Sequence, residues 1–146
     1  MCLLTAKGRY FKARYDITCY KIVYLENSEK WSGAYGYGNK TFDFDKVLVE
    51  SKGCPKPKHD WHGRVIHESP FVELHEGYFH SCVYKKECEG LKGCAALLRA
   101  EFSKPNNINN FVVCECTIPK GTIYYTSEND HCFASRKIIV HKPENL

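Results

Sequence analysis

The chain has 146 residues, a length typical of one folded domain, and its hydrophobic fraction of 43% and charged fraction of 26% are ordinary for globular proteins. These values exclude disordered and collagen-like chains, and no apolar run approaches the roughly 18 residues of a membrane-spanning helix. The formal charge is only +4, with 21 basic residues interspersed among 17 acidic ones, so no nucleic-acid partner is predicted. We expect one globular domain over residues 1–146 without membrane contact.

The nine cysteines raise the question of disulfides. Their number is odd, and the first residues carry no apolar run of the length that a secretory signal needs. Instead, Lys7 and Arg9 follow almost at once. We therefore expect a cytoplasmic protein whose thiols stay reduced and pack as small hydrophobic groups.

The first half of the chain predicts short strands separated by turns. Residues 16–25 are rich in β-branched and aromatic side chains, which is typical of a central strand. Three glycines among aromatic residues make 31–39 a predicted loop, and 42–49 a return to strand. A connection with two prolines follows at 53–60. Further short strands are expected at 64–67, 71–75 and 78–82.

The second half contains one change of period. Apolar residues recur at helical spacing over 89–102, which predicts one amphipathic helix packed on the sheet. Its apolar stripe is Leu91, Cys94, Ala95, Leu98 and Phe102. Strands are expected after the helix at 110–118, 122–125 and 132–140. The order of strands, one helix and strands predicts an α+β domain with a predominantly antiparallel sheet.

Histidine and cysteine residues are the candidate metal ligands and nucleophiles. A zinc site usually brings two pairs of ligands at short spacing, and here His59 with His62, or Cys114 with Cys116, is a half-site without a second pair. We therefore expect no bound metal. His80 and Cys82 would share one face of a strand, an arrangement that can activate a thiol, but buried packing is the commoner role and no catalytic residue is assigned.

Polar groups interrupt three otherwise apolar strands, at Lys21, at His80 with Ser81, and at Ser135 with Arg136. A buried polar atom without a partner is costly, so these groups need a partner or a ligand unless they face water. If the strands are neighbours, Arg136 offers bidentate donors, Lys21 a point charge, and His80 a donor whose charge varies near neutral pH. We predict that these five residues form an anion-binding site.

Four short motifs carry a resemblance. Residues 16–21 (DITCYK), 77–81 (GYFHS), 118–125 (IPKGTIYY) and 134–138 (ASRKI) resemble segments of small uncharacterised proteins from bacteria and their phages. The resemblance covers most of the chain and implies a bacterial or phage setting without implying an activity. A phage-encoded chain is expected in the host cytoplasm or in the virion.

The order of the motifs is more distantly similar to the ADP-ribosyltransferase fold. That family has an early strand with a basic residue, a central Ser/Thr strand leading into a helix, and a late strand with a catalytic glutamate, with NAD between them. The resemblance places Lys21 at the first feature and Ser81 at the second, whereas Ser135 and Arg136 stand where the glutamate is expected. It implies NAD or an ADP-ribose-like ligand, with the glutamate unmatched.

Three functions stay open from the sequence. The leading hypothesis is a non-catalytic small domain that binds a nucleotide-like or other anionic ligand, or a protein partner, without a resident cofactor. The alternatives are an ADP-ribosyltransferase-like enzyme that uses NAD, and a structural or assembly protein of a phage particle.

Overall fold

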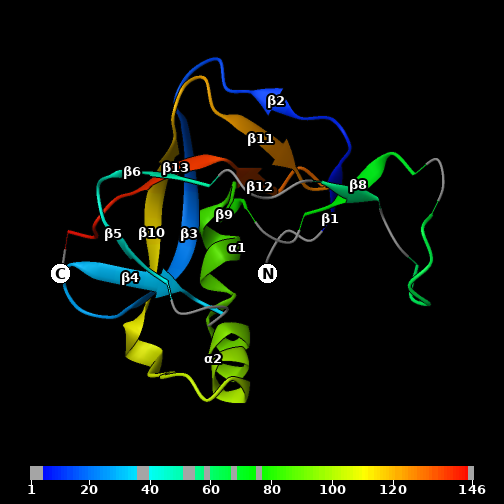
Figure 1. Ribbon diagram of the computed structural model, residues 1–146. Helices are drawn as coiled ribbons and strands as arrows, with labels where there is room; N and C mark the ends of the chain where they lie inside the picture. The colour runs from blue at the N-terminus through cyan, green and yellow to red at the C-terminus, as the bar shows by residue number, and fades with distance from the viewer. Residues whose placement is uncertain are drawn as a thin grey trace.

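The computed structural model describes residues 5–35, 40–50, 55–57, 60–66, 69–74 and 77–144 of the chain. These residues form a mostly antiparallel β-sheet and one bent helix of 17 residues, which confirms the predicted α+β class (Figure 1). None of the helices in the described part of the chain combines the length and the apolar character that a membrane span requires.

The strands of the described residues form two sheets. The smaller sheet has the order β1-β8-β7, with β1 (Thr5–Lys7), β8 (Phe71–Glu73) and β7 (Lys56–Pro57). The larger sheet runs β2 (Phe11–Lys12), β11 (Ile123–Thr126), β12 (Cys132–Ser135), β9 (Phe79–Cys82), β3 (Ile17–Leu25), β10 (Phe111–Ile118), β13 (Lys137–Val140) and β6 (Val47–Val49). β4 (Lys30–Gly33) also pairs with β3, and β5 (Thr41–Asp43) pairs with β4.

The larger sheet is rolled, because two strands that are consecutive in the chain occupy distant positions in it. Only Arg136 separates β12 from β13, yet β12 pairs with β9 and β13 pairs with β10, on opposite sides of β3. In a flat sheet these positions would lie about four strand spacings apart, roughly 19 Å, whereas the two residue steps from Ser135 to Lys137 span at most about 7 Å. The segment predicted as one strand at 132–140 is therefore two strands, and the prediction of a single strand is wrong.

β3 is the central strand, and its side chains point alternately into two separate hydrophobic cores. One face contributes Cys19 and Val23 to the inner core, which lies inside the rolled sheet. The inner core consists of Cys19, Val23, Trp31, Phe44, Phe79, Cys114, Cys116, Ile118, Ile138 and Val140. The other face contributes Ile22 and Tyr24 to the outer core, which the helix covers. The outer core consists of Ile22, Tyr24, Ala34, Tyr35, Cys82, Cys88, Ala95 and Phe111.

The helix begins earlier than predicted and bends. It consists of α1 (Lys85–Glu89) and α2 (Lys92–Glu101), so the expected single helix over 89–102 is corrected at its start and in its continuity. Gly90 lies at the bend, where glycine disfavours a regular helix. Figure 1 shows α1 beside β9 and β3, and α2 extending below them.

The apolar stripe of the helix is only partly as expected. Leu91, Ala95 and Leu98 pack in or against the outer core, whereas Cys94 and Phe102 are exposed. The stripe prediction is therefore wrong at Cys94 and Phe102. One turn after Ala95, the buried residue is a charged one, Arg99.

Arg99 fastens the helix to the β3–β4 hairpin. Its side chain is 2% exposed. The guanidinium donates hydrogen bonds to the carbonyl oxygens of Gly33, at 2.8 Å, and Pro105, at 2.5 Å, and lies 3.9 Å from the centre of the Tyr24 ring. Glu26 supplies a carboxylate oxygen at 3.8 Å. A buried charge is tolerated when it is paired and hydrogen-bonded in this way.

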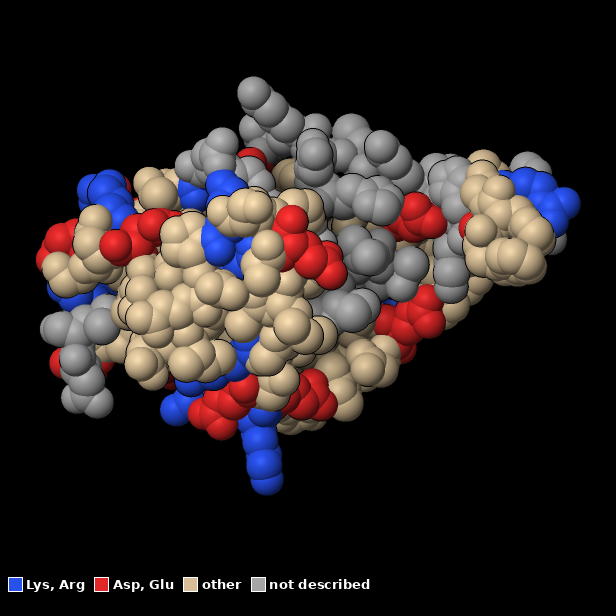
Figure 2. Space-filling model, turned by 90° about the horizontal axis from the view of Figure 1, so that it is seen from below, with Lys and Arg blue, Asp and Glu red and all other residues tan. Residues whose placement is uncertain are grey.

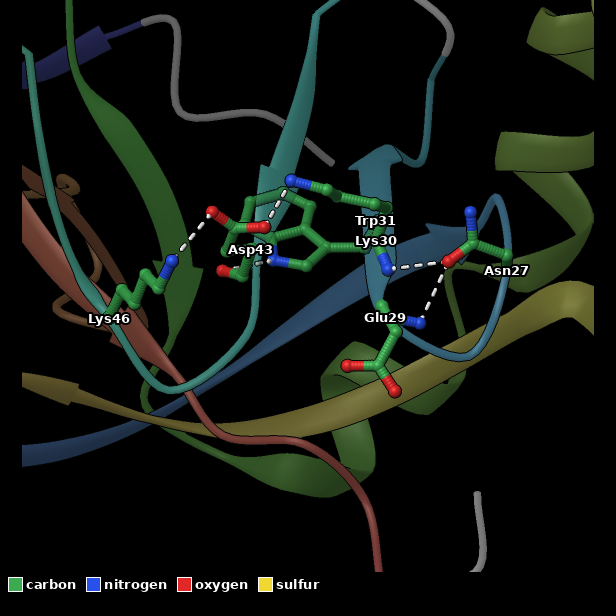
Figure 3. Close-up of polar contacts among 6 residues, drawn as sticks. All are labelled: Asn27, Glu29, Lys30, Trp31, Asp43 and Lys46. Carbon is green, nitrogen blue, oxygen red and sulfur yellow. Dashed lines mark hydrogen bonds and ion pairs between the residues drawn. The ribbon is translucent and has the colours of Figure 1, made fainter.

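The β3–β4 turn and the β4–β5 pair are held by polar contacts (Figure 3). The Asn27 side-chain oxygen accepts hydrogen bonds from two backbone N–H groups, including that of Lys30 at 3.0 Å. The Trp31 indole donates to the Asp43 carbonyl at 3.3 Å, and the Asp43 carboxylate accepts from Lys30. Residues 31–33 are thus strand, which corrects the loop predicted over 31–39; residues 36–39 lie outside the described part.

The remaining differences concern short strands. The predicted strand 42–49 is two strands, β5 and β6, separated by a turn in which Asp45 has a φ of 59°. Residues 64–66 form no strand, contrary to prediction. β1, β2 and β7 have two or three residues each, which is too short for an alternating pattern to predict.

Candidate functional site

β3 leaves a gap along the edge that faces β9 and β4. Tyr20 lies opposite Cys82 of β9, and Val23 lies opposite Gly33 of β4, so the two residues between them pair with neither strand. A cavity of about 100 Å³ occupies this gap. Its walls are residues 20–22 of β3, 80–82 of β9, 33–35 after β4, and the helix residues Cys88 and Leu91.

Lys21 brings a positive charge to the cavity. Its ammonium donates a hydrogen bond to the His80 carbonyl oxygen at 2.8 Å, and its side chain is half-buried. No carboxylate of the described residues forms an ion pair with it. Among the described residues, the charge of Lys21 therefore has no carboxylate to balance it, in a place that water reaches only in part.

His80 and Ser81 add two buried polar atoms beside Lys21. His80 Nδ1 has no hydrogen-bond partner, and Ser81 Oγ has the Cys19 thiol as its neighbour without an oxygen or nitrogen partner. Burial, helped by the nearby Lys21 charge, lowers the pKa of His80 to about 3. His80 is thus neutral at neutral pH, and the expectation that its charge varies there is wrong.

Ser135 and Arg136 lie elsewhere. Ser135 is fully buried in β12. Arg136 donates a hydrogen bond to the Gly77 carbonyl at 2.9 Å and its guanidinium lies 4.1 Å from the centre of the Tyr78 ring. The strand register separates the backbones of Arg136 and Lys21 by two strand spacings and three residues, roughly 14 Å. The structure brings three of the five predicted site residues to one cavity and places the other two outside its lining.

Six of the described cysteines form two groups, which we call the inner thiols and the outer thiols. The inner thiols are Cys19, Cys114 and Cys116, in the inner core, and Cys19 lies opposite Cys116 in the β3–β10 ladder. The outer thiols are Cys82, Cys88 and Cys132, and Cys82 lies opposite Cys132 in the β9–β12 ladder. Two outer thiols, Cys82 and Cys88, border the cavity. All seven described cysteines are unpaired.

The pairing of His80 with Cys82 does not activate the thiol. Cys132 donates a hydrogen bond to the Cys82 sulfur, which lowers the pKa of Cys82, but the hydrogen bond from Cys82 to Cys88 and burial raise that pKa to about 11. Within the described ranges, no group of three or more His, Cys, Asp or Glu residues fits a metal ion. His59, His67 and His75 lie outside those ranges, so the absence of a metal stays a prediction.

Surface charge points to no further site on the face shown in Figure 2. Lys and Arg are interspersed with Asp and Glu around a tan area, without a patch of one sign. Several charged side chains of the described residues form ion pairs, among them Lys142 with Glu29 and Lys40 with Glu50, each at 3.2 Å. The cavity beside β3 combines a positive side chain with buried polar atoms, and it is the candidate site.

Sequence reasoning missed two walls of this cavity, residues 33–35 and Cys88. The first falls in a stretch predicted as a loop, and the second precedes the predicted helix, so no periodic signal marked either of them. The chain matches no protein-family model, and comparisons with curated proteins and with solved structures find no similar protein. The resemblances to phage proteins and to the ADP-ribosyltransferase fold accordingly stay predictions.

Proposed function

We propose that this chain is a non-catalytic small domain that binds an anionic ligand in the cavity beside β3. The observation that supports the proposal is the Lys21 ammonium, which is half-buried, bonded to one carbonyl, and without a carboxylate partner among the described residues. A charge in a desolvated place is costly unless it is paired. A bound anion supplies the missing counter-charge.

The size and lining of the cavity narrow the class of ligand. Its volume of about 100 Å³ is well below the roughly 300–1,000 Å³ of pockets that enclose drug-sized ligands. A whole nucleotide exceeds this volume, whereas a carboxylate or a single phosphate group with a few further atoms fits. Ile22, Ala34 and Leu91 make much of the wall apolar. A short-chain carboxylate, with its charge at Lys21 and Ser81 and its chain against this wall, matches both features.

Binding rather than group transfer is proposed because of the polar groups in the lining. The described lining residues include no Asp or Glu, and the ring of His80 is neutral at physiological pH. A transferase of the kind that the distant resemblance implies needs a carboxylate at the reacting centre. NAD therefore enters the proposal only as one anion to be tested for binding.

Calorimetric titration of the wild type, Lys21→Met and Lys137→Met with acetate, butyrate, phosphate, AMP and NAD tests the proposal. Methionine keeps the length of lysine and removes its charge, and Lys137 is an exposed residue of β13, so its variant controls for net charge. We expect butyrate to bind the wild type and the Lys137 variant alike. Loss of a charge-assisted hydrogen bond should weaken binding to Lys21→Met by about 10- to 100-fold.

Two results would contradict the proposal. One is equal affinity of the Lys21→Met and wild-type proteins for every anion in the panel. The other is no heat of binding from any of these anions to the folded wild type at millimolar concentration. Binding of inorganic phosphate without binding of butyrate would keep the site and move the ligand class to phosphates.

A further inference from the structure

The outer thiols meet where β9, β12 and α1 converge. Cys82 and Cys132 are direct cross-strand neighbours. The next residue pair along the ladder exchanges a hydrogen bond, Val83 N–H to His131 O at 2.9 Å, so Cys82 and Cys132 occupy a non-hydrogen-bonded position, where side chains approach most closely. On its other side, Cys82 packs with Cys88 in the outer core, and both residues border the cavity. Cys82 is thus the middle member of a chain of three thiols.

Access distinguishes the members of this chain. Cys82 and Cys88 border the cavity, whereas Cys132 does not. Cys88 is 0% exposed and Cys82 is 7% exposed, so a reagent reaches Cys88 through the cavity rather than from the outer surface. A water molecule needs about 10–15 Å³ of such space, and the cavity of about 100 Å³ therefore admits a molecule the size of a hydroperoxide.

The pKa values of the two cavity thiols, Cys82 and Cys88, are shifted in opposite directions. The hydrogen bond from Cys82 lowers the pKa of Cys88, and the Lys21 charge and the Ile22 backbone N–H act in the same direction, against the effect of burial. The pKa of Cys82 is raised to about 11, and that of Cys132 is raised by its hydrogen bond to Cys82 and by burial. The thiolate is the nucleophile in thiol chemistry, so Cys88 is the member of the chain that reacts first.

We propose that Cys88 and Cys82 form a peroxide-sensitive thiol pair, in which Cys88 is oxidised first and Cys82 then closes a Cys82–Cys88 disulfide. The Cys88 thiolate attacks one oxygen of a hydroperoxide, so that an S–O bond forms, the O–O bond breaks, and the other oxygen leaves as an alcohol or water after taking a proton. The Cys82 sulfur then attacks the Cys88 sulfenic acid, an S–S bond forms, the S–O bond breaks, and water leaves with the Cys82 proton. The two thiols lose two electrons, which the hydroperoxide gains.

This pair does not rest on the proposed anion binding, because it uses the cavity as a route of access and the charge of Lys21 itself, and no bound anion takes part. The disulfide would join β9 to the following helix across the cavity wall. Cys94, which is exposed on α2, and Cys132 serve as internal comparisons, since neither borders the cavity.

Peptide mapping of the full chain tests the proposal. The folded protein is treated with an equivalent of hydrogen peroxide, its remaining thiols are blocked, and it is digested with trypsin without reduction. Lys85 and Lys86 lie between the two cysteines, so trypsin separates them and a disulfide appears as two linked peptides. We expect the Cys82–Cys88 link in the wild type and in Cys94→Ser and Cys132→Ser, since serine at 132 keeps a hydroxyl donor toward Cys82.

The order of the two steps has its own readout. In Cys82→Ser the second step is blocked, so dimedone, which reacts with sulfenic acids, should label Cys88. The proposal is overturned if wild-type protein forms a Cys82–Cys132 link instead, or if peroxide oxidises Cys94 while Cys82 and Cys88 stay reduced. The wild-type result decides between these outcomes even if a serine variant fails to fold.

Discussion

The inner and outer thiols flank β3 and are built on the same plan, each with two cysteines directly opposite one another across an antiparallel ladder. The inner thiols are closed in by the rolled sheet, with exposures of 0–1%, and none of them lines the cavity beside β3. The outer thiols are covered by a helix, which leaves a cavity next to a cation. In the proposed thiol pair, the element that covers a buried cysteine, more than its cross-strand partner, distinguishes a thiol that reacts from one that only packs.

The largest expected effect comes from placing the same charge in both groups. Cys116→Asp buries an unpaired carboxylate in the inner core and should cost about 4 kcal/mol or more, on the order of the stability of a small domain. Cys132→Asp introduces the charge at a half-buried position, from which it can turn to water, and should cost about 1–2 kcal/mol. Urea unfolding of both variants gives the two free energies. Equal losses of unfolding free energy would show that the inner and outer thiols are equally inaccessible to water.

The inner group contains one position where a carboxylate should be tolerated better. Cys114 lies opposite Lys21 in the β3–β10 ladder, so Cys114→Asp provides a counter-charge that no described carboxylate gives Lys21. We expect it to cost about 1–3 kcal/mol less than Cys116→Asp, because a paired buried charge avoids much of the desolvation penalty. The same variant should lose butyrate binding, since its own carboxylate occupies the ammonium. A loss of stability as large as that of Cys116→Asp would mean that Lys21 is not within reach.

The comparison of the two groups also explains what could be predicted from the sequence. β3 and β10 are long and rich in β-branched residues, so their pattern was sufficient to predict both strands. Lys21, His80 and Ser81 were identified as polar residues in apolar strands, and they meet because β3 and β9 are neighbours. Placing Arg136 required the register and the sharp turn between β12 and β13, neither of which leaves a local signal.

The start of the helix is another feature that leaves no local signal in the sequence. In α1 only Cys88 is buried, and a single buried position has no period, so the pattern placed the helix start four residues too late. The buried Arg99 is a second case, because an arginine on an apolar stripe is read from the sequence as exposed. Both residues owe their burial to tertiary contacts with β3 and β4.

A smaller effect is expected from pH, through the neutral His80 that lies beside the outer thiols. Its pKa is about 3 in the folded protein against an ordinary 6.5, so between these values the unfolded chain binds more protons than the folded one. Stability should therefore fall as the pH drops below 6.5, by at most about 1.4 kcal/mol per pH unit. Urea unfolding at pH 7 and at pH 5 should show that the free energy of unfolding of the wild type falls by about 1–2 kcal/mol. The fall should be smaller in His80→Asn. The same loss in both proteins would assign the effect to other groups.

The smallest perturbation is alkylation of the thiols in the folded wild-type protein, and the measured quantity is the alkylation rate of each cysteine. A buried thiol reacts only when the structure around it opens, so its rate reports the free energy of that opening. With iodoacetamide at neutral pH, exposed Cys94 should react first and half-buried Cys132 next, whereas Cys19 and Cys116 should react only at the rate of global unfolding. Time-resolved peptide mass spectrometry follows each cysteine separately. In urea without reductant, the full chain should titrate as nine free thiols, and a count near one would show that disulfides form. Inner thiols that react as fast as Cys132 would remove the distinction between the two groups, because it would mean that the rolled sheet opens as readily as the helix that covers the outer core.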